Sequence, residues 1–349
     1  MEKSLKIRLL NLNPLVNLQN GLFNLETYQL QPHSPDIYST IQLGVKYEPS
    51  AKCNKWVNTL NEIFQGVQEK IQTLQEFLGL CFTRDTKYEK ALLCVGEGGN
   101  GKGVILNTFE QLIGKENCTS IPLEKFCDAH YTANMFGKLA NISTETNAKS
   151  EVYDSVFKAI ISGDPIQADL KFKNAFKFRP FCKLVFAMNN LPRVDDKTNA
   201  FYRRLVILRF DREFSETEQN KNLKHELVAE LNGIFIWCLE GLKRLRERGY
   251  FDITEKIQQE IDEYRKDNNN VIVFVEEECS FSAEFSIEKS KLYLAYAESC
   301  EINRYRPLSK KKFGSELQKH FKAVQDDRLN TVRIWRGIDL SSSAPVTYR

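Results

Sequence analysis

Apolar residues recur along the chain with two different spacings, which predict its helices and strands. From Cys53 to about Phe82 they lie three and four positions apart, as on the buried face of a helix. Residues 216–265 show the same helical spacing. Four short apolar runs predict strands instead, at residues 91–95, 138–142, 182–187 and 205–210. Residues 103–113 are expected to form a helix after the first of these strands.

This alternation of strands and helical segments predicts an α/β fold, with a mostly parallel sheet covered by helices on both faces. Before it, Asn20-Gly21 between apolar residues predicts a tight hairpin turn. After it, residues 267–270 (DNNN) are expected to be a linker. A short Val/Ile/Phe strand, helices around 287–300 and 309–322, and a hairpin over 323–338 are expected to complete the chain.

Length and composition narrow the class of protein. A chain of 349 residues is expected to form two or three domains. No apolar run reaches the roughly 18 residues of a membrane span, so a cytoplasmic protein is expected, in the host cytoplasm if a phage or plasmid encodes it. Nine cysteines without a C-x-x-C pair, and four dispersed histidines, argue against a zinc site and a disulfide framework.

A glycine-rich stretch, 96-GEGGNGKG-103, joins the first strand to the following helix. Its G-x-x-x-x-G-K spacing is typical of a loop whose backbone amides wrap nucleotide phosphates while one lysine reaches the terminal phosphates. The candidate nucleotide-binding residues are Gly96, Glu97, Gly98, Gly99, Asn100, Gly101, Lys102 and Gly103. A glycine-rich turn without a ligand is the alternative.

Gly103 departs from the loop pattern, which places Ser or Thr at this position as a ligand of Mg²⁺. Because Mg²⁺ keeps several waters in most nucleotide sites, a water can take the place of the missing hydroxyl. The sequence therefore predicts nucleotide binding with weaker metal affinity. Loss of hydrolysis is the competing interpretation.

Polar residues at the ends of later strands are candidates for catalysis. Glu145 follows the second strand, where a carboxylate can orient the attacking water or hold Mg²⁺ through water. Asn189 follows the third, where an amide can bond the γ-phosphate or that water. Arg203 and Arg204 precede the fourth strand, where one of them can act as an arginine finger across a subunit boundary. A solvated Glu, a turn Asn and surface ion pairs are the alternatives.

Two basic regions indicate a nucleic-acid partner. In 163-GDPIQADLKFKNAFKFRP-180, Lys171, Lys173 and Lys177 alternate with phenylalanines, a pattern suited to gripping single-stranded DNA. Such a hairpin can also bury its Phe face and point its lysines outward. Residues 303–336 hold ten Lys/Arg and three Asp/Glu, a local charge of 10 − 3 = +7, which suits phosphate contact or a solvated basic face.

In this order, the motifs resemble the helicase part of phage, plasmid and poxvirus primase–helicases, which belong to superfamily 3 of the AAA+ ATPases. The resemblance rests on 76–103 for motif A, 137-GKLANISTET-146 for motif B, 189-NNLP-192 for motif C and 200-AFYRRLVILRF-210 for the arginine pair. Residues 20–36, 227–245 and 292–317 resemble the N-terminal segment, the helical lid and the winged-helix domain. Glu145 stands without the preceding acid that many relatives have, since Thr144 occupies that position.

The resemblance implies four parts: an N-terminal segment (1–85), an AAA+ core (86–214), a helical lid (215–268) and a winged-helix domain (271–349). It implies a DNA helicase that uses ATP and Mg²⁺ and forms a ring, with six subunits expected. Single-stranded and forked DNA are the implied partners, with a separate primase or polymerase, or else the chain is a fragment. On the winged helix, Lys310, Lys311 and Lys312 are the candidate DNA-binding residues.

Two other functions remain open at this point. One is a replication initiator or loader that uses nucleotide binding only as an assembly switch, which Gly103 slightly favours. The other is a small-molecule phosphotransferase, which the lid and both basic regions argue against. DNA-stimulated ATP hydrolysis separates the first two functions from the third, and duplex unwinding separates the helicase from the initiator.

Overall fold

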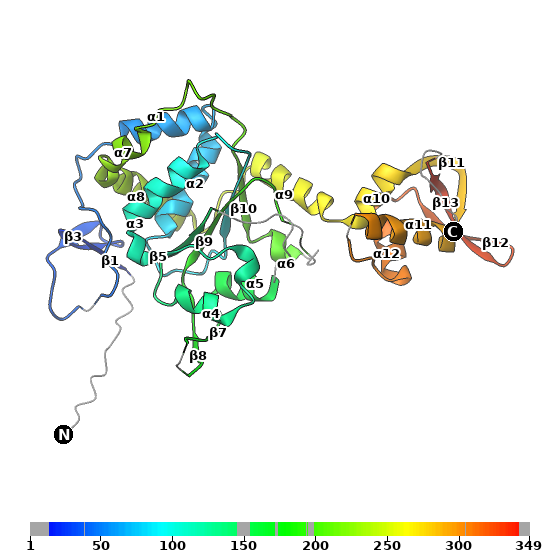
Figure 1. The fold of residues 1–349 in the computed structure, drawn as a ribbon, viewed down its shortest axis with the longest axis horizontal. Coiled ribbons are helices and arrows are strands. Elements are labelled where there is room, and N and C mark those ends of the chain that lie inside the picture. Colours follow the sequence, from blue (N-terminus) through cyan, green and yellow to red (C-terminus); the bar gives the residue numbers. More distant parts are fainter. Residues whose placement is uncertain are drawn as a thin grey trace. The chain divides into compact units, whose positions relative to one another are not determined.

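The computed structural model describes residues 14–37, 39–144, 154–171, 174–192, 194, 199–303 and 305–341. The chain divides into two compact units, residues 1–261 and 262–349 (Figure 1). In the described parts of both units, no helix has the length and hydrophobicity that crossing a membrane requires.

A small antiparallel sheet opens the first unit, with strands β1 (Leu15–Leu18), β2 (Gly21–Asn24) and β3 (Gln29–Gln31). The predicted hairpin is confirmed, but its turn is Gln19-Asn20, because Leu18 pairs with Gly21. Gly21 serves a different purpose: a Cβ there would lie 2.5 Å from the carbonyl oxygen of Gln31 on β3. The glycine therefore lets a third strand approach.

The predicted helical region from Cys53 to Phe82 forms two helices, α1 (Asn54–Ile63) and α2 (Gln68–Leu80). They are separated because Gln65 and Gly66 both adopt left-handed backbone conformations, with φ of 51° and 76°. A helix cannot continue through such residues. The apolar spacing continues across the break because both helices bury a face in the same unit.

The central sheet confirms the α/β prediction. Its strands are β4 (Ala91–Val95), β5 (Cys118–Thr119), β6 (Ala140–Ser143), β9 (Lys183–Met188) and β10 (Leu205–Arg209), all parallel, in the order β10-β4-β9-β6-β5. Four of them match the predicted strands, and β5 was not predicted because it has only two residues. Strands β4 and β9 are buried along their whole length, as expected at the centre of a parallel sheet.

Helices cover this sheet on both faces (Figure 1). From β4 the chain passes through α3 (Lys102–Ile113) to the edge strand β5, and it then returns in the opposite direction through β6 and β9 to β10. Because such crossovers are right-handed, α3 lies on one face of the sheet and the later connections lie on the other. Helices α7 (Leu223–Val228) and α8 (Leu231–Arg248) pack against α3, and α8 also packs against α2. The remaining helical segments of the core are η1 (Lys115–Asn117), η2 (Leu123–Lys125), α4 (Ala129–Thr132), η3 (Ala133–Met135), α5 (Asp154–Ser162) and α6 (Asn199–Tyr202).

Helices α2 and α8 are held together by close backbone approach and a buried ion pair. A Cβ on Gly79 would lie 2.3 Å from the Cys238 carbonyl oxygen, so this glycine allows the contact. The Glu76 carboxylate, only 3% exposed, accepts a hydrogen bond from Arg244 Nε at 2.7 Å and another from Arg248. The pair anchors α8 to the N-terminal helices.

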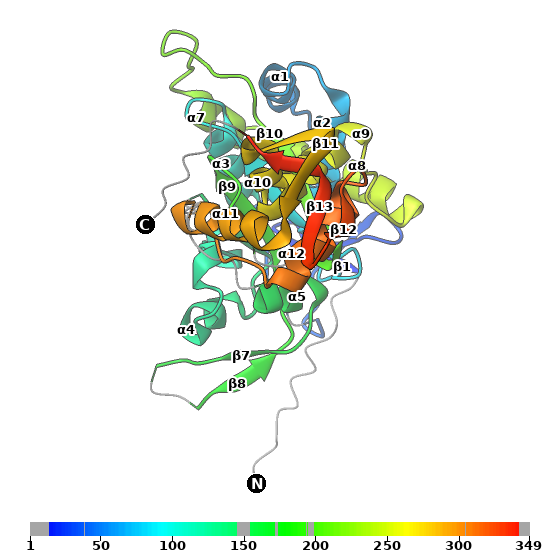
Figure 2. The same ribbon diagram turned by 90° about the vertical axis from the view of Figure 1, so that its right-hand side faces the viewer.

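A second hairpin projects from the core in both views (Figures 1 and 2). Its strands, β7 (Ile166–Ala168) and β8 (Phe176–Phe178), pair antiparallel, with Ile166 opposite Phe178. The hairpin expected from alternating lysine and phenylalanine is therefore present.

The second unit contains α10 (Asn270–Glu278), β11 (Cys279–Glu288), α11 (Lys289–Ile302), α12 (Lys310–His320), β12 (Gln325–Leu329) and β13 (Val332–Leu340). The strands form an antiparallel sheet in the order β11-β13-β12. The last two helices and the final hairpin were predicted. The expected Val/Ile/Phe strand is wrong: residues 271–275 lie in α10, where Val271, Phe274 and Val275 pack into the core of this unit.

The expected linker at residues 267–270 is also wrong. Helix α9 (Glu255–Asp267) runs across the boundary between the units, and the three asparagines that follow are buried. The Asn269 side chain caps α10 by accepting from the Val271 amide, and its Nδ2 donates to Glu316 at 3.3 Å. Asn270 Nδ2 donates to the Arg306 carbonyl at 3.2 Å. Asn269 and Asn270 belong to the C-terminal unit because their side-chain amides form hydrogen bonds with residues of that unit.

Candidate functional site

The glycine-rich loop lies at the carboxyl edge of the parallel sheet, between β4 and α3. Val95 of β4 pairs with Met188 of β9, and the Gly96 amide donates to the Met188 carbonyl at 3.1 Å. Asn189, the next residue, therefore lies beside the start of the loop, and it is exposed. Since the chain leaves β4 towards one side of the sheet and leaves β9 towards the other, this edge is a switch point of the kind where α/β folds bind ligands.

Two loop glycines are required by the backbone and its neighbours. Gly101 has a φ of 86°, and a Cβ there would lie 2.5 Å from the Ile63 side chain at the end of α1. Gly96 has a φ of 156°, and a Cβ there would lie 2.6 Å from the Phe210 carbonyl oxygen. The loop thus fits closely between α1 and the segment after β10.

The loop has backbone amides available for an anion. Among the described residues, the N–H groups of Glu97, Gly98 and Gly99 donate no hydrogen bond. They stand before the N-terminus of the twelve-residue helix α3, where the helix dipole favours negative charge. The donors present therefore suit the phosphates of a nucleotide.

Lys102 is buried and turned towards its own loop. Its ammonium donates to the Glu97 carbonyl at 2.8 Å, to Asn100 Oδ1 at 3.0 Å and to the Gly96 carbonyl. Burial lowers the pKa of Lys102. Asn100 holds this arrangement, because its Nδ2 also donates to the Phe210 carbonyl at 3.3 Å. A phosphate can replace these carbonyl partners with a full negative charge.

Gly103 occupies the second position of α3, and a Cβ built on it meets nothing within 4 Å. Its backbone is outside the left-handed region. The glycine is therefore not required by the fold, and a serine hydroxyl would fit the same backbone.

Two predicted residues, Glu145 and Lys173, lie outside the described residues. The neighbour of Glu145, Thr144, is exposed at the end of β6, which pairs with β9. No group of three or more potential metal ligands (His, Cys, Asp or Glu) occurs in the part of the chain that the structure describes.

The two arginines before β10 differ in their surroundings. Arg204 is buried: its guanidinium pairs with Glu89 at 2.8 Å and donates to Ser162 Oγ at 3.2 Å and to the Ala200 carbonyl. The Arg203 side chain is 59% exposed and lies 3.6 Å from the same carboxylate. Arg204 is therefore held by contacts within its own chain, whereas Arg203 is accessible.

The predicted DNA-binding lysines that the structure describes are all exposed: Lys171, Lys177, Lys310, Lys311 and Lys312. Lys177 lies on β8 with Phe176 and Phe178 on the opposite face of the hairpin. The ring of Phe136 packs edge-on against both phenylalanines, with centroids 5.6 and 5.4 Å apart, yet Phe136 is 58% exposed. Sequence reasoning missed Phe136 because it lies 30 residues before the hairpin and outside every motif.

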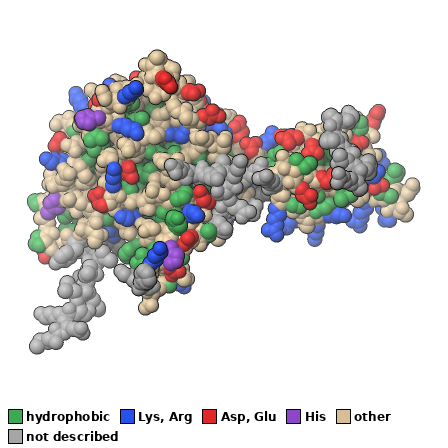
Figure 3. Space-filling model, viewed as in Figure 1, with side chains coloured by type: hydrophobic (Ala, Val, Ile, Leu, Met, Phe, Trp, Pro, Cys, Tyr) green, Lys and Arg blue, Asp and Glu red, His purple; other side chains and the backbone are tan. Residues whose placement is uncertain are grey.

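The last three lysines begin α12, which Ser309 caps by accepting from the Lys312 amide. Figure 3 shows Lys and Arg side chains gathered along the edge of the C-terminal unit where Figure 1 places α12. Part of the charge excess predicted over residues 303–336 therefore lies at the surface, at the start of α12.

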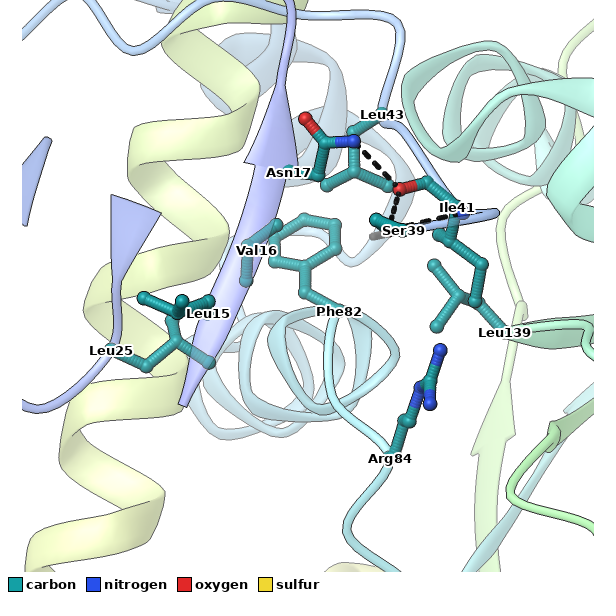
Figure 4. A pocket seen from close by; sticks show the side chains of 10 residues that line it. All are labelled: Leu15, Val16, Asn17, Leu25, Ser39, Ile41, Leu43, Phe82, Arg84 and Leu139. Carbon is teal, nitrogen blue, oxygen red and sulfur yellow. Dashed lines mark hydrogen bonds between the residues drawn. The ribbon is translucent and has the colours of Figure 1, made fainter. Parts of the chain in front are cut away.

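A pocket in the first unit lies away from the loop, between β1, residues 39–43 and Leu139, which precedes β6 (Figure 4). Its polar groups already bond one another: Asn17 Nδ2 and Ser39 Oγ both donate to the Ile41 carbonyl, at 3.1 and 2.6 Å. The rest of its lining is largely apolar, apart from Arg84. It offers no arrangement of donors for a triphosphate.

Three family models match successive parts of the chain. Residues 3–65 match the family described as D5 N terminal like, residues 94–204 a family of unknown function (DUF5906), and residues 266–336 the family described as Poxvirus D5 protein-like. The middle match runs from β4, just before the phosphate-loop candidate, to the arginine pair.

The chain is similar to curated proteins of large DNA viruses. It is 24% identical over 226 residues to Putative helicase L207/L206 of Acanthamoeba polyphaga mimivirus, which covers 61% of this chain and 23% of that protein. It is 24% identical over 245 residues to Putative helicase 121R of Invertebrate iridescent virus 3, covering 64% of this chain and 26% of that one. Putative helicase 184R of Invertebrate iridescent virus 6 is 21% identical over 361 residues, or 88% of this chain and 37% of the relative.

Among solved structures, the apo C-terminal region of NrS-1 has a similar fold, with a TM-score of 0.54 at 14% identity. The match covers 84% of this chain and 79% of that one. The chain spans between about a quarter and somewhat over a third of the length of its curated relatives. With D5-like matches at both ends, viral relatives named putative helicases and this fold, the chain is similar to D5-type helicases.

Proposed function

We propose that this chain is the motor part of an ATP-dependent DNA helicase that acts in replication of a virus, phage, plasmid or other mobile element. The observation that carries the proposal is the loop of residues 96–103, whose free amides stand before α3 at the carboxyl edge of the sheet. Similarity to the D5-like families and to viral putative helicases makes a replicative role the best supported use of such a loop.

The proposed cofactors are ATP and Mg²⁺. The amides of Glu97, Gly98 and Gly99 would hold the phosphates, and Lys102 would exchange its carbonyl partners for the terminal phosphates. Mg²⁺ would neutralise phosphate charge when bound. Asn189, which lies beside the loop, would bond the γ-phosphate or the attacking water, and Glu145 would orient that water.

Assembly into a ring would complete the site. Arg203 precedes β10, whereas the loop follows β4, and these strands are parallel neighbours of five residues. Five residues of strand span roughly 16 Å, so Arg203 lies at the edge of the sheet opposite to its own loop. It can therefore serve only the loop of another copy. A hexamer is the proposed assembly.

DNA would be contacted at two places. The β7–β8 hairpin offers Lys171 and Lys177 for the backbone and the exposed ring of Phe136 for stacking. The C-terminal unit has the element order of a winged helix, α-β-α-α-β-β, and α12 with Lys310–Lys312 is its proposed recognition helix. The helical segment α7–α9 is the proposed lid.

The test is ATP hydrolysis measured with and without single-stranded DNA, together with the mass of the assembly. Hydrolysis should rise with DNA, and Lys102→Ala should abolish it. Lys115→Ala, which removes an exposed charge elsewhere, is the control. If Lys102→Ala hydrolyses ATP as fast as the unaltered protein, the proposed site is wrong.

A replication initiator or loader is the second candidate, favoured by the absence of a hydroxyl at Gly103. Unwinding of a tailed duplex separates the two functions. ATP-dependent assembly on DNA without strand separation would support the initiator.

A further inference from the structure

The residues just before β4 run directly beside the arginine pair. The Glu89 carboxylate lies 2.8 Å from the Arg204 guanidinium and 3.6 Å from that of Arg203. The Lys90 ammonium donates to the Arg203 carbonyl at 2.6 Å, and the Ala91 amide donates to the Arg204 carbonyl at 2.8 Å. Three successive residues therefore contact the two arginines, although Lys90 and Arg203 are 113 positions apart in the chain.

The backbone of Glu89 is strained. Its φ of 47° lies in the left-handed region, which is unfavourable for a residue with a Cβ. The Glu89 amide donates to the Thr86 carbonyl at 3.0 Å, so a turn holds the residue in this conformation. Strain of this kind gathers at functional sites, and here it brings the carboxylate to both guanidiniums.

Glu89 holds the two arginines unequally, although the same oxygen, Oε2, serves both. Arg204 is at hydrogen-bond distance and has two further acceptors, Ser162 and Ala200. Arg203 is 3.6 Å away, beyond the range of a hydrogen bond, and its side chain is 59% exposed. Arg203 is therefore the arginine that an external anion can take from Glu89.

Lys90 adds positive charge beside Arg203. Burial, and next the charge of Arg203, lower the pKa of Lys90 from 10.5 to about 8. At neutral pH the ammonium still carries its charge, so it repels the Arg203 guanidinium and attracts the Glu89 carboxylate. The cluster of Glu89, Lys90, Arg203 and Arg204 then has three cations and one carboxylate, and this excess favours a second anion.

We propose that Glu89 and Lys90 are positioning residues that control when Arg203 binds phosphate. Glu89 retains the guanidinium while no phosphate is present, and the charge of Lys90 weakens this hold so that the guanidinium transfers to a phosphate. Because Arg203 lies at the edge of the sheet away from its own loop, that phosphate belongs to the nucleotide of another copy. The inference rests on the proposed function, and in particular on its arginine finger.

Steady-state ATP hydrolysis at saturating single-stranded DNA and about pH 7 tests the role of Lys90. Lys90→Met should lower kcat about threefold, as expected for loss of one charge interaction near the surface. KM should stay unchanged, because Arg203 acts on the transition state and not on ATP binding. Lys90→Arg keeps the charge and should keep kcat.

Lys87→Met, which removes an exposed charge from the same turn, is the matched control and should also keep kcat. Equal losses of kcat in Lys90→Met and Lys90→Arg, or a loss in neither, overturn the role of Lys90. A rise in KM as large as the fall in kcat also overturns it.

Adding Glu89→Gln to Lys90→Met tests the competition for Arg203. The amide keeps an acceptor for Arg204 but no longer holds Arg203 by charge, so kcat should return to that of Glu89→Gln alone. If the double variant is as slow as Lys90→Met, Lys90 does not act through Glu89 and the proposal is wrong. The Lys90 variants decide by themselves if Glu89→Gln does not fold.

Two variants separate this inference from the proposed function. If Lys102→Ala abolishes hydrolysis and Arg203→Ala abolishes its stimulation by DNA, whereas Lys90→Met equals the unaltered protein, the motor stands and this inference alone is wrong. If Arg203→Ala has no effect, the arginine finger and this inference fail together.

Discussion

Gly103→Ser tests whether the missing hydroxyl limits this site. The fold permits the change, because a Cβ at Gly103 meets nothing within 4 Å and the backbone is outside the left-handed region. Serine is also the better helix former, so α3 should gain a few tenths of a kcal/mol. The variant therefore folds without strain, so a change in activity reflects either the hydroxyl or the greater stability of α3.

The magnitude follows from the ligand that the hydroxyl replaces. In the unaltered protein a water would take the vacant position on Mg²⁺, at an entropic cost of up to about 2 kcal/mol. A serine hydroxyl already fixed on α3 avoids most of this cost. With about 1.4 kcal/mol per tenfold, the Mg²⁺ concentration for half-maximal hydrolysis should fall roughly five- to twentyfold.

The assay is steady-state ATP hydrolysis over a Mg²⁺ titration, at saturating ATP and single-stranded DNA. Gly103→Ala is the matched control, since it adds the same Cβ and favours the helix at least as strongly as serine, without a hydroxyl. If alanine shifts the Mg²⁺ requirement as much as serine does, helix stability is the cause. If neither variant shifts it, the metal is not bound beside residue 103.

Three further predictions concern charged residues whose burial and contacts the structure shows. Glu76→Gln should lower the free energy of unfolding by about 3 kcal/mol in urea, because it leaves two arginines on α8 without their buried carboxylate; a loss below 1 kcal/mol would contradict this. Burial lowers the pKa of Lys183 from 10.5 to about 8. The unfolded chain therefore binds more protons between these values, and stability should rise from pH 8 to 10.5; an equal rise in Lys183→Met would refute it. Arg204→Ala should lower the melting temperature, whereas Arg203→Ala should leave it unchanged and abolish DNA-stimulated hydrolysis; equal melting temperatures would show that Arg204 is not structural.

The sequence by itself determined the features that depend only on residues close to one another along the chain. The glycine-rich loop was predicted because its amides, its lysine and the helix start are all contiguous between residues 95 and 104. The four longer strands of the sheet were predicted because buried parallel strands are continuous apolar runs. The β7–β8 hairpin followed from local alternation, since side chains in a strand point to alternate faces.

Where a short apolar run was compatible with either a strand or a helix, the prediction from the sequence was wrong. Residues 271–275 look like a strand because Val, Ile and Phe are common in strands, but the Asn269 cap and packing against β11, α11 and α12 favour a helix. The buried asparagines before them resemble a linker in composition only. Their role depends on Glu316 and Arg306, which are more than 30 residues away.

Only the tertiary structure decided which charged residues are accessible. Arg203 and Arg204 are adjacent and chemically identical, yet Glu89 and Ser162 bury one and leave the other exposed. Packing brought Phe136 to the β7–β8 hairpin. Such contacts join residues distant along the chain, and a spacing pattern carries no information about them because they form only when the chain folds.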